Sequence, residues 1–596
     1  MGFRDRTDAL RVLDDAYRAL DDGAASNAFL SLRSRQDAHE ALDTAFREVP
    51  DGPLTGMIIA VKDNIDVAGF DTTAACPGYA YRPERDAACV AALRASGAVV
   101  IGKTNLDQFA TGLVGTRSPY GAVGDTAVAE RISGGSSSGS AVAVAAGIVD
   151  AALGTDTAGS GRVPAGLQGI VGIKATVGVV SAEGVVPACE SYDCVTVFAR
   201  SSGEADAVMA VMASTGSRAW PSDVRFTAPT TPVVGVPADL PGLSASWREA
   251  FDGAVEHLRT TGCEIRTIDL TPALEAARML YDSALVAERA EAVGTFVAAA
   301  SANDAVSAEA GLDQTVAGIV TDAGQWNGVD VLRAQRLLAE RGRAALQEWD
   351  GADVVLVPTA PFHPTIVAVD ADPVGVNSAM GIYTNFCNLM DLCGVAVPWT
   401  TVGDSGRPED GASASLPAQF GVTVLARAFE DGVAGGVASL FGGAGRAEDV
   451  VASWTAGIAE GDSAGAGPEA VPVVVFGAHL RGQPLNRELR ALGASFVGDV
   501  ETTPDYRLYA LDTVPPKPGL TGPVEDGRRI AGEEWLISPA GLGRFLAGLP
   551  APMALGQVTL SDGRQVTGFT CQPAAVDGAE DISAFGGWRG YVSQGE

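Results

Sequence analysis

Hydrophobic and polar positions along the chain follow two patterns, short apolar runs and helical spacing, in segments that alternate. Short continuous apolar runs, typical of buried strands, occur at 57–61, 98–102, 232–236, 353–357 and 394–398. Helical spacing occupies the first fifty residues and the segments 86–96, 138–149, 242–262, 271–300 and 329–349. This alternation predicts an α/β fold for residues 1–440, with a mixed central sheet covered by helices and with N-terminal helices in 1–50.

The pattern changes after about residue 440. Residues 441–470 are rich in Gly, Ala and acidic side chains, and predict a helical or flexible linker. Shorter strands divided by Pro and Gly follow, and SDG at 561–563 separates two alternating runs as in a β-hairpin. We expect a small α+β C-terminal domain over residues 471–596.

Composition narrows the function classes. The 596 residues carry a formal net charge of −32, which argues against nucleic acid or an anionic membrane as a partner. No apolar stretch reaches the ~18 residues of a membrane span, and the N-terminus has the pattern of an amphipathic helix rather than a signal peptide. The eight cysteines form no CxxC pair and the four histidines lie far apart. We therefore expect a cytoplasmic enzyme with no metal and no cofactor.

Two serine-rich motifs follow a lysine that ends a buried run. Lys62 closes the run at 57–61, ISGGSSSGSAVAVAAG occupies 132–147, and Ser160 lies in GTDTAGSGR between two glycines. Neither the Walker nor the dinucleotide spacing is present, so phosphate binding is disfavoured. A serine on such a sharp turn exposes its hydroxyl, and consecutive backbone amides there can stabilise an oxyanion.

The serines have no histidine nearby to act as their base, so Lys62 is the remaining candidate. A lysine with an ordinary pKa near 10.4 requires about 4.6 kcal/mol to be neutral at pH 7, so burial must lower that pKa by several units. The alternative is that the serines only cap a helix and that Lys62 is a solvated surface charge. Ser137, Ser138 and Asp156 have the residue types that orient and cap rather than react.

These three motifs, in this order, resemble the amidase signature family. The resemblance implies that Lys62 is the general base, that Ser136 is a bridging serine on a cis peptide bond, and that Ser160 is the nucleophile. It also implies an oxyanion hole formed by the backbone amides of Thr157, Ala158 and Gly159.

Within that family the chain is most similar to allophanate hydrolases. The similarity rests on the segments KDNIDVAGFDTTAACPGYAY (62–81), SYDCVTVFAR (191–200), YTNFCNLMDLCGVAVP (383–398), FGAHLRGQPLN (476–486) and ISAFGGWRGYV (582–592). It implies hydrolysis of the terminal amide of allophanate to ammonia and N-carboxycarbamate, a homodimer, and a functional link to a biotin-dependent urea carboxylase. Whether allophanate comes from urea carboxylation or from triazine breakdown stays open.

A small anionic substrate requires a local cation, because the net charge of the chain repels it. Tyr281 and Arg289 lie eight residues apart in a segment (279–293) with helical spacing, so one face of a single helix could carry both. The resemblance implies that both contact substrate. The alternative is that Arg289 pairs with Glu288 on a solvated helix.

The C-terminal domain resembles the gamma-glutamyl cyclotransferase fold, and the glycine turn after its strand at 473–476 carries His479. The resemblance implies that this domain helps N-carboxycarbamate to decarboxylate, with His479 as the candidate residue and Gln483 and Asn486 as weaker ones. Glu533 and Glu534 receive no role. Four alternatives remain: a broad-specificity amidase, a glutaminase-type component of a tRNA amidotransferase, an inactive scaffold, and a C-terminal domain that serves only assembly.

Overall fold

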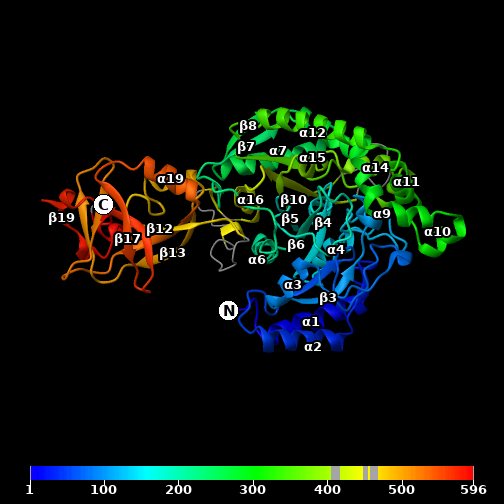
Figure 1. The fold of residues 1–596 in the computed structure, drawn as a ribbon, viewed down its shortest axis with the longest axis horizontal. Coiled ribbons are helices and arrows are strands. Elements are labelled where there is room, and N and C mark those ends of the chain that lie inside the picture. The colour runs from blue at the N-terminus through cyan, green and yellow to red at the C-terminus, as the bar shows by residue number, and fades with distance from the viewer. Residues whose placement is uncertain (1, 404–415, 444, 448–453, 457–466, 595–596) are drawn as a thin grey trace. The chain divides into compact units, whose positions relative to one another are not determined.

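The computed structural model describes residues 2–403, 416–443, 445–447, 454–456 and 467–594 (Figure 1). The chain divides into two units, one formed by Met1–Arg218 with Val233–Ala444 and the other by Ala219–Pro232 with Gly445–Glu596. The expected linker at 441–470 lies largely outside the described residues. Each unit has its own sheet and its own apolar core.

The first unit is built on a mixed sheet. Within the described residues its strand order is β1-β3-β2-β4-β6-β5-β10-β11-β9-β7-β8. The strands are β1 (Phe29–Leu32), β2 (Ile58–Lys62), β3 (Val99–Thr104), β4 (Ala151–Asp156), β5 (Val171–Lys174), β6 (Cys194–Ala199), β7 (Val233–Pro237), β8 (Glu264–Ile268), β9 (Val354–Pro358), β10 (Cys393–Val402) and β11 (Ala418–Ala426). β2 is parallel to both β3 and β4, whereas β6 is antiparallel to β4 and β5. The predicted α/β class is confirmed.

Helices cover this sheet (Figure 1). They are α1 (Arg6–Asp21), α2 (Arg35–Glu48), α3 (Ala88–Ala95), α4 (Ser138–Ala145), α5 (Val163–Gln168), α6 (Ser202–Ala213), α7 (Ala245–Thr260), α8 (Thr271–Asp282), α9 (Ala287–Ala300), α10 (Asp304–Ala310), α11 (Gln314–Ala323), α12 (Gly328–Glu348), α13 (Ile366–Ala371), α14 (Gly375–Met380), α15 (Asn385–Leu389) and α16 (Asp431–Ser439). The apolar faces of α1 and α2 share one core with β2, β3 and α4. Because α4 is buried along nearly its whole length, its residues are small or apolar.

Each apolar run predicted as a strand in this unit is a strand, and the helices expected in 1–50 are α1 and α2, but β1 was not expected and the prediction for 271–300 is wrong. The first fifty residues contain the short strand β1 between α1 and α2. The segment 271–300 is not one helix, because α8 ends at Ser283, which has extended backbone dihedrals. The Ser283 hydroxyl donates to Met279 O at 2.6 Å and accepts from Leu285 N at 3.4 Å. This side chain competes with the helical hydrogen bonds, and α9 starts afresh at Ala287.

The second unit is an α+β domain, as predicted. Its described residues form a sheet of order β13-β16-β12-β18-β17 and a smaller one of order β15-β14-β19. Its elements are β12 (Val471–Val475), α18 (Asn486–Ala491), β13 (Ser495–Glu501), β14 (Arg507–Leu511), β15 (Lys517–Thr521), β16 (Ala531–Ile537), α19 (Pro539–Ala547), β17 (Met553–Thr559), β18 (Gln565–Cys571), β19 (Glu580–Asp581) and α20 (Trp588–Val592). β17 and β18 form the predicted hairpin around SDG.

Residues 219–232 lie far from the second unit in sequence but belong to it in space. Phe226 N donates to Gly493 O at 2.8 Å, and Ala540 N donates to Ser222 O at 3.0 Å. Arg490 also donates to Ala228 O at 2.9 Å. The sequence did not predict that residues 219–232 belong to the second unit, because this segment has neither strand nor helix periodicity.

Candidate active site

Lys62 is the last residue of β2, a strand whose five residues are all buried. Its Nζ lies 2.8 Å from Ser136 Oγ and 2.7 Å from Thr155 Oγ1, so Lys62 joins the two motifs that the sequence singled out. The side chain has no solvent exposure. The alternative of a solvated surface lysine is therefore excluded.

Burial lowers the pKa of Lys62 to about 7, although the carboxylates of Asp107, Asp193 and Asp156 act to raise it. Desolvation penalises the ammonium form, and none of the three carboxylates lies within ion-pair distance of it in the described structure. A substantial fraction of Lys62 is thus neutral near pH 7. This matches the requirement that the sequence set for a lysine base.

Ser136 follows Gly135 through a cis peptide bond, as the family resemblance implied, and precedes α4. The space around the bond is filled, since a Cβ on Gly135 would lie 2.1 Å from Asp107 Oδ2. Asp107 accepts the amides of Val114, Gly115 and Arg117 at 3.0 to 3.2 Å. The Asp107 carboxylate therefore orders the loop at 107–117, while the Asp107 backbone amide donates to Ser136 O at 3.1 Å and joins this loop to the one carrying Ser136.

Ser160 lies on the turn between β4 and α5. The buried ion pair of Asp156 and Arg162 fixes this turn, with Nε to Oδ2 and Nη2 to Oδ1 both at 2.9 Å. Ser160 Oγ donates to Gly112 O at 3.4 Å, and within the described residues it makes no hydrogen bond to Ser136 Oγ. The described structure therefore links Ser136 to Lys62 and Ser160 to the loop at Gly112, and the predicted contact between the two serines stays a prediction. Such contacts often tighten only when substrate binds.

One of the three amides predicted for the oxyanion hole already has an acceptor in the protein. Gly159 N donates to Asp156 Oδ1 at 2.8 Å, so this amide is already occupied. Among the described residues, the amides of Thr157, Ala158 and Ser160 have no protein acceptor. Gly159 has φ +128°, and a Cβ there would lie 2.3 Å from Thr384 Oγ1. Its function in the turn is therefore conformational.

Tyr281 and Arg289 meet, though not on one helix as predicted. Tyr281 belongs to α8 and Arg289 to α9, and the break at Ser283 turns the two side chains together. Arg289 Nη2 lies 3.2 Å from the Tyr281 hydroxyl, and Nη1 donates to Thr111 Oγ1 at 2.7 Å. Thr111 precedes Gly112, whose carbonyl contacts Ser160. One short loop thus contacts both the candidate nucleophile and the candidate substrate cation.

Arg289 is a buried cation that has no carboxylate partner within the described ranges. It is only 2% exposed, and no described carboxylate lies within 4 Å of its guanidinium. The expected alternative partner, Glu288, instead accepts Ser191 N at 2.9 Å. The Nε–H of Arg289 has no acceptor among the described residues either. An unpaired guanidinium of this kind is costly unless an anion joins it.

Four further residues complete the site without having been predicted. Thr155 accepts the Lys62 hydrogen bond and Asp107 holds the Ser136 loop. Thr111 contacts Arg289, and Asp193 accepts the Thr157 hydroxyl together with Ala188 N at 2.8 Å. Asp193 lies in the quoted segment SYDCVTVFAR, which was a signal that could have found it.

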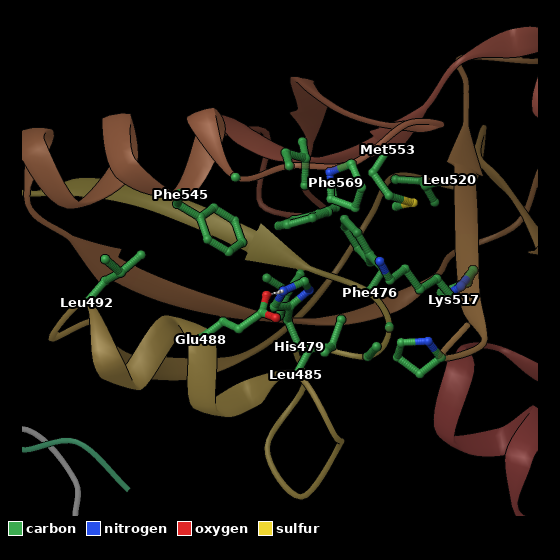
Figure 2. Close-up of a pocket in the computed structure, with 18 of the residues that line it drawn as sticks. Phe476, His479, Leu485, Glu488, Leu492, Lys517, Leu520, Phe545, Met553 and Phe569 are labelled. Atoms are coloured by element: carbon green, nitrogen blue, oxygen red, sulfur yellow. Dashed lines mark hydrogen bonds and ion pairs between the residues drawn. The ribbon is translucent and has the colours of Figure 1, made fainter. Parts of the chain in front are cut away.

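His479 is in the second unit, on the loop after β12, at a cavity of about 580 Å³ (Figure 2). Its Nε2 lies 3.1 Å from Glu488 Oε2, and its ring stacks at 4.9 Å on Phe569. Burial lowers the pKa of His479, and the Glu488 carboxylate opposes that shift. The imidazole is therefore mainly neutral at pH 7 and becomes a better acid as the pH falls.

The other candidates of this unit have structural contacts. Asn486 Nδ2 donates to His479 O at 2.8 Å and so holds the loop, whereas Gln483 makes a backbone bond to Leu480 O. Glu533 is buried and accepts from Arg481 and Arg589, and Glu534 forms a two-pronged pair with Arg564 at 2.7 and 2.8 Å.

In the described ranges, no group of three or more His, Cys, Asp or Glu side chains is arranged to hold a metal ion. Nor does any described helix have the length and apolarity needed to span a membrane.

Comparisons with known proteins agree with this geometry. Residues 9–433 match the Amidase family model, and residues 471–593 match the Allophanate hydrolase C-terminal domain. The chain is 40% identical over 557 residues to urea amidolyase of Lachancea kluyveri, which is 90% of this chain but only 29% of that relative. A solved allophanate hydrolase of Kluyveromyces lactis shares 36% identity with a TM-score of 0.84, covering 100% of this chain and 98% of the other. A glutamyl-tRNA(Gln) amidotransferase component of Acidobacterium capsulatum is 32% identical over 62% of this chain and 81% of its own.

Proposed function

Because the chain belongs to the amidase family and carries an allophanate hydrolase C-terminal domain, we propose that it hydrolyses allophanate, a urea unit with a carboxylate on one nitrogen. The observation that carries this proposal is the buried Arg289, which lacks a carboxylate partner in the described structure and is linked through the loop at 111–112 to Ser160. An uncharged amide has no use for such a cation. Allophanate supplies the anion that the site lacks.

In the proposed reaction Ser160 Oγ attacks the terminal amide carbon of allophanate. Its proton passes through Ser136 to neutral Lys62, and the same route returns a proton to the nitrogen that leaves as ammonia. Water then hydrolyses the acyl-enzyme to N-carboxycarbamate. This order is supported by the 2.8 Å contact of Lys62 with Ser136 and by the lowered pKa of Lys62.

The negative charge that develops on the carbonyl oxygen needs nearby donors. We assign this function to the amides of Thr157, Ala158 and Ser160, in place of Gly159, because these amides have no acceptor in the described protein. Arg289 would bind the substrate carboxylate through its free N–H groups, with Tyr281 holding the guanidinium plane.

We propose that the second unit acts on the product. N-carboxycarbamate carries two carboxylates on one nitrogen, and protonation of that nitrogen assists loss of carbon dioxide. His479 is the candidate acid, supported by its place at a cavity and its contact with Glu488. The likeness to urea amidolyases also supports a functional link to a biotin-dependent urea carboxylase. A homodimer and a cytoplasmic location are further parts of this proposal.

Ammonia release from synthetic allophanate tests the proposal, with urea and malonamate as comparators. We expect allophanate to be used far better than either, because urea lacks the carboxylate and malonamate lacks the bridging nitrogen. Comparable turnover of a neutral aliphatic amide would instead favour a broad-specificity amidase. Glutamine-dependent ammonia release would favour a component of an amidotransferase, and the relative of this kind compared above matches 62% of this chain.

A further inference from the structure

The cavity in the second unit is larger and more apolar than the proposed intermediate requires. Its volume of about 580 Å³ falls in the range of pockets that hold ligands of drug size. Its wall includes Phe476, Phe545, Phe569, Leu492, Leu520 and Met553, which surround His479 in Figure 2. N-carboxycarbamate is a small dianion without any apolar surface. It would leave most of this wall in contact with water.

The charged side chains that line the cavity favour a ligand with one negative charge. Lys517 and Arg544 both line it, and within the described chain neither forms an ion pair. The Lys517 side chain extends from β15 into the cavity, and its charge is near enough to lower the pKa of His479 (Figure 2). The one carboxylate in the described wall, Glu488, already contacts His479. The cavity therefore offers a cation at the edge of an aromatic wall.

We propose that this cavity binds an amphipathic carboxylate, with its carboxylate at Lys517 and a phenyl-sized or branched alkyl body among the three phenylalanines. Aromatic rings in such a wall pack edge to face, as Phe545 already does against His479 and Phe569 at 5.2 and 5.4 Å between centroids. The inference goes beyond the proposed hydrolysis of allophanate and does not depend on it. A ligand here would cover His479 and so connect the second unit to a molecule other than the substrate.

Calorimetric titration of the full chain with 3-phenylpropionate tests this inference. Acetate keeps the charge without the ring, and 3-phenylpropan-1-ol keeps the ring without the charge. We expect 3-phenylpropionate to bind with a Kd at least tenfold lower than either probe. Equal affinity for 3-phenylpropionate and one of these probes would overturn the proposal.

Two variants locate the binding site. Lys517→Gln removes the charge but keeps a polar side chain and should weaken binding about tenfold, whereas Arg529→Gln makes the same charge change at an exposed position outside the cavity and should not. Leu492→Trp fills part of the cavity and should also weaken binding. If Leu492→Trp does not fold, the lysine variant decides alone. If the Lys517 and Arg529 variants bind 3-phenylpropionate with equal affinity, the proposal is contradicted. This is also the result expected if 3-phenylpropionate binds at Arg289 in the first unit.

Discussion

Burial lowers the pKa of Lys62, so this side chain, which is ordinarily a cation at pH 7, can lose its proton and accept another. Its side chain is fully enclosed and forms hydrogen bonds with Ser136 and Thr155, and its pKa falls to about 7. Three carboxylates nearby limit that fall. The lysine can therefore change protonation state within the physiological range, as a general base must.

The pH dependence of kcat/KM should report this group. Below about pH 7 Lys62 is an ammonium ion and cannot accept a proton, so we expect activity to fall on the acid side and to rise through an apparent pKa near 7. The measurement is ammonia release from allophanate between about pH 5.5 and 9. A flat profile across pH 7 would show that no lysine with this pKa takes part.

The three candidate catalytic side chains should act as one unit. Ser160→Ala should abolish ammonia release, and Lys62→Ala and Ser136→Ala should each lower kcat by several orders of magnitude. The Lys62→Ala/Ser160→Ala double variant should be little worse than Ser160→Ala alone. Near-wild-type turnover in Lys62→Ala would remove Lys62 from the mechanism.

At the residue scale, the sequence predicted those side chains that lie inside a motif. Lys62, Ser136 and Ser160 each end or interrupt a recognisable run, and in the structure Lys62 contacts Ser136 while Ser160 contacts the loop at Gly112. Thr155 and Asp193 were not assigned, because their contacts join positions that are 93 and 36 residues apart in the chain. A sequence does not show which amides already have an acceptor, as the amide of Gly159 does in Asp156.

At the scale of elements, the turn between β4 and α5 determines where Ser160, the proposed nucleophile, lies. Asp156 and Arg162 are both inaccessible to solvent, and Asp156 also accepts the amides of Gly159 and Gly161 at 2.8 and 2.9 Å. Removing one partner leaves a buried charge alone, which is far more harmful than never having had the pair.

Asp156→Ala should therefore destabilise the protein by about 3 to 5 kcal/mol, measured by urea unfolding of the first unit. Glu275→Ala serves as control, because it removes a half-exposed pair with Arg341 and should change stability by at most about 1 kcal/mol. Asp156→Leu/Arg162→Met should recover much of the loss. Equal stability of the Asp156 and Glu275 variants would show that the turn is not held by this pair.

Helices and strands were predicted correctly where burial determines the sequence pattern. They were missed where a single side chain determines where an element ends. β2, β3 and β9 are continuous apolar runs, and each was found within two residues. The break between α8 and α9 was missed, because the helical spacing continues across Ser283 while its hydroxyl bonds the backbone instead. β1 was missed because a four-residue strand is too short to show a period.

At the scale of the whole molecule, the two units suggest two consecutive reactions, hydrolysis in the first unit and decarboxylation of the product in the second. His479→Ala should leave the initial burst of ammonia intact and slow the later loss of carbon dioxide by roughly 10²- to 10⁴-fold. His39→Ala is the matched control, since His39 is partly exposed on α2 and pairs with Asp14. Because burial lowers the pKa of His479, its contribution should increase as the pH falls from about 8 to 6.

Rapid ¹³C NMR of labelled allophanate follows the intermediate during this experiment. Alkaline conditions slow its spontaneous decay and reveal the enzymatic part. If the His479 and His39 variants clear N-carboxycarbamate at the same rate, the second unit does not act on the product and serves assembly or ligand binding instead.

With a net charge of −32, the protein as a whole repels the anionic substrate that it is proposed to bind. Selectivity must then come from Arg289, the buried guanidinium without a carboxylate partner in the described structure. Biuret is the matched neutral substrate, since it replaces the carboxylate of allophanate with an amide.

The most direct test is the ratio of kcat/KM for allophanate to kcat/KM for biuret, in the wild type and in Arg289→Ala, with Arg333→Ala on the exposed face of α12 as control. A charged hydrogen bond contributes about 1.5 to 3 kcal/mol, so the ratio should fall about 10- to 100-fold in Arg289→Ala and stay unchanged in Arg333→Ala. If Arg289→Ala lowers both substrates equally, Arg289 is structural and the chain is not selective for allophanate.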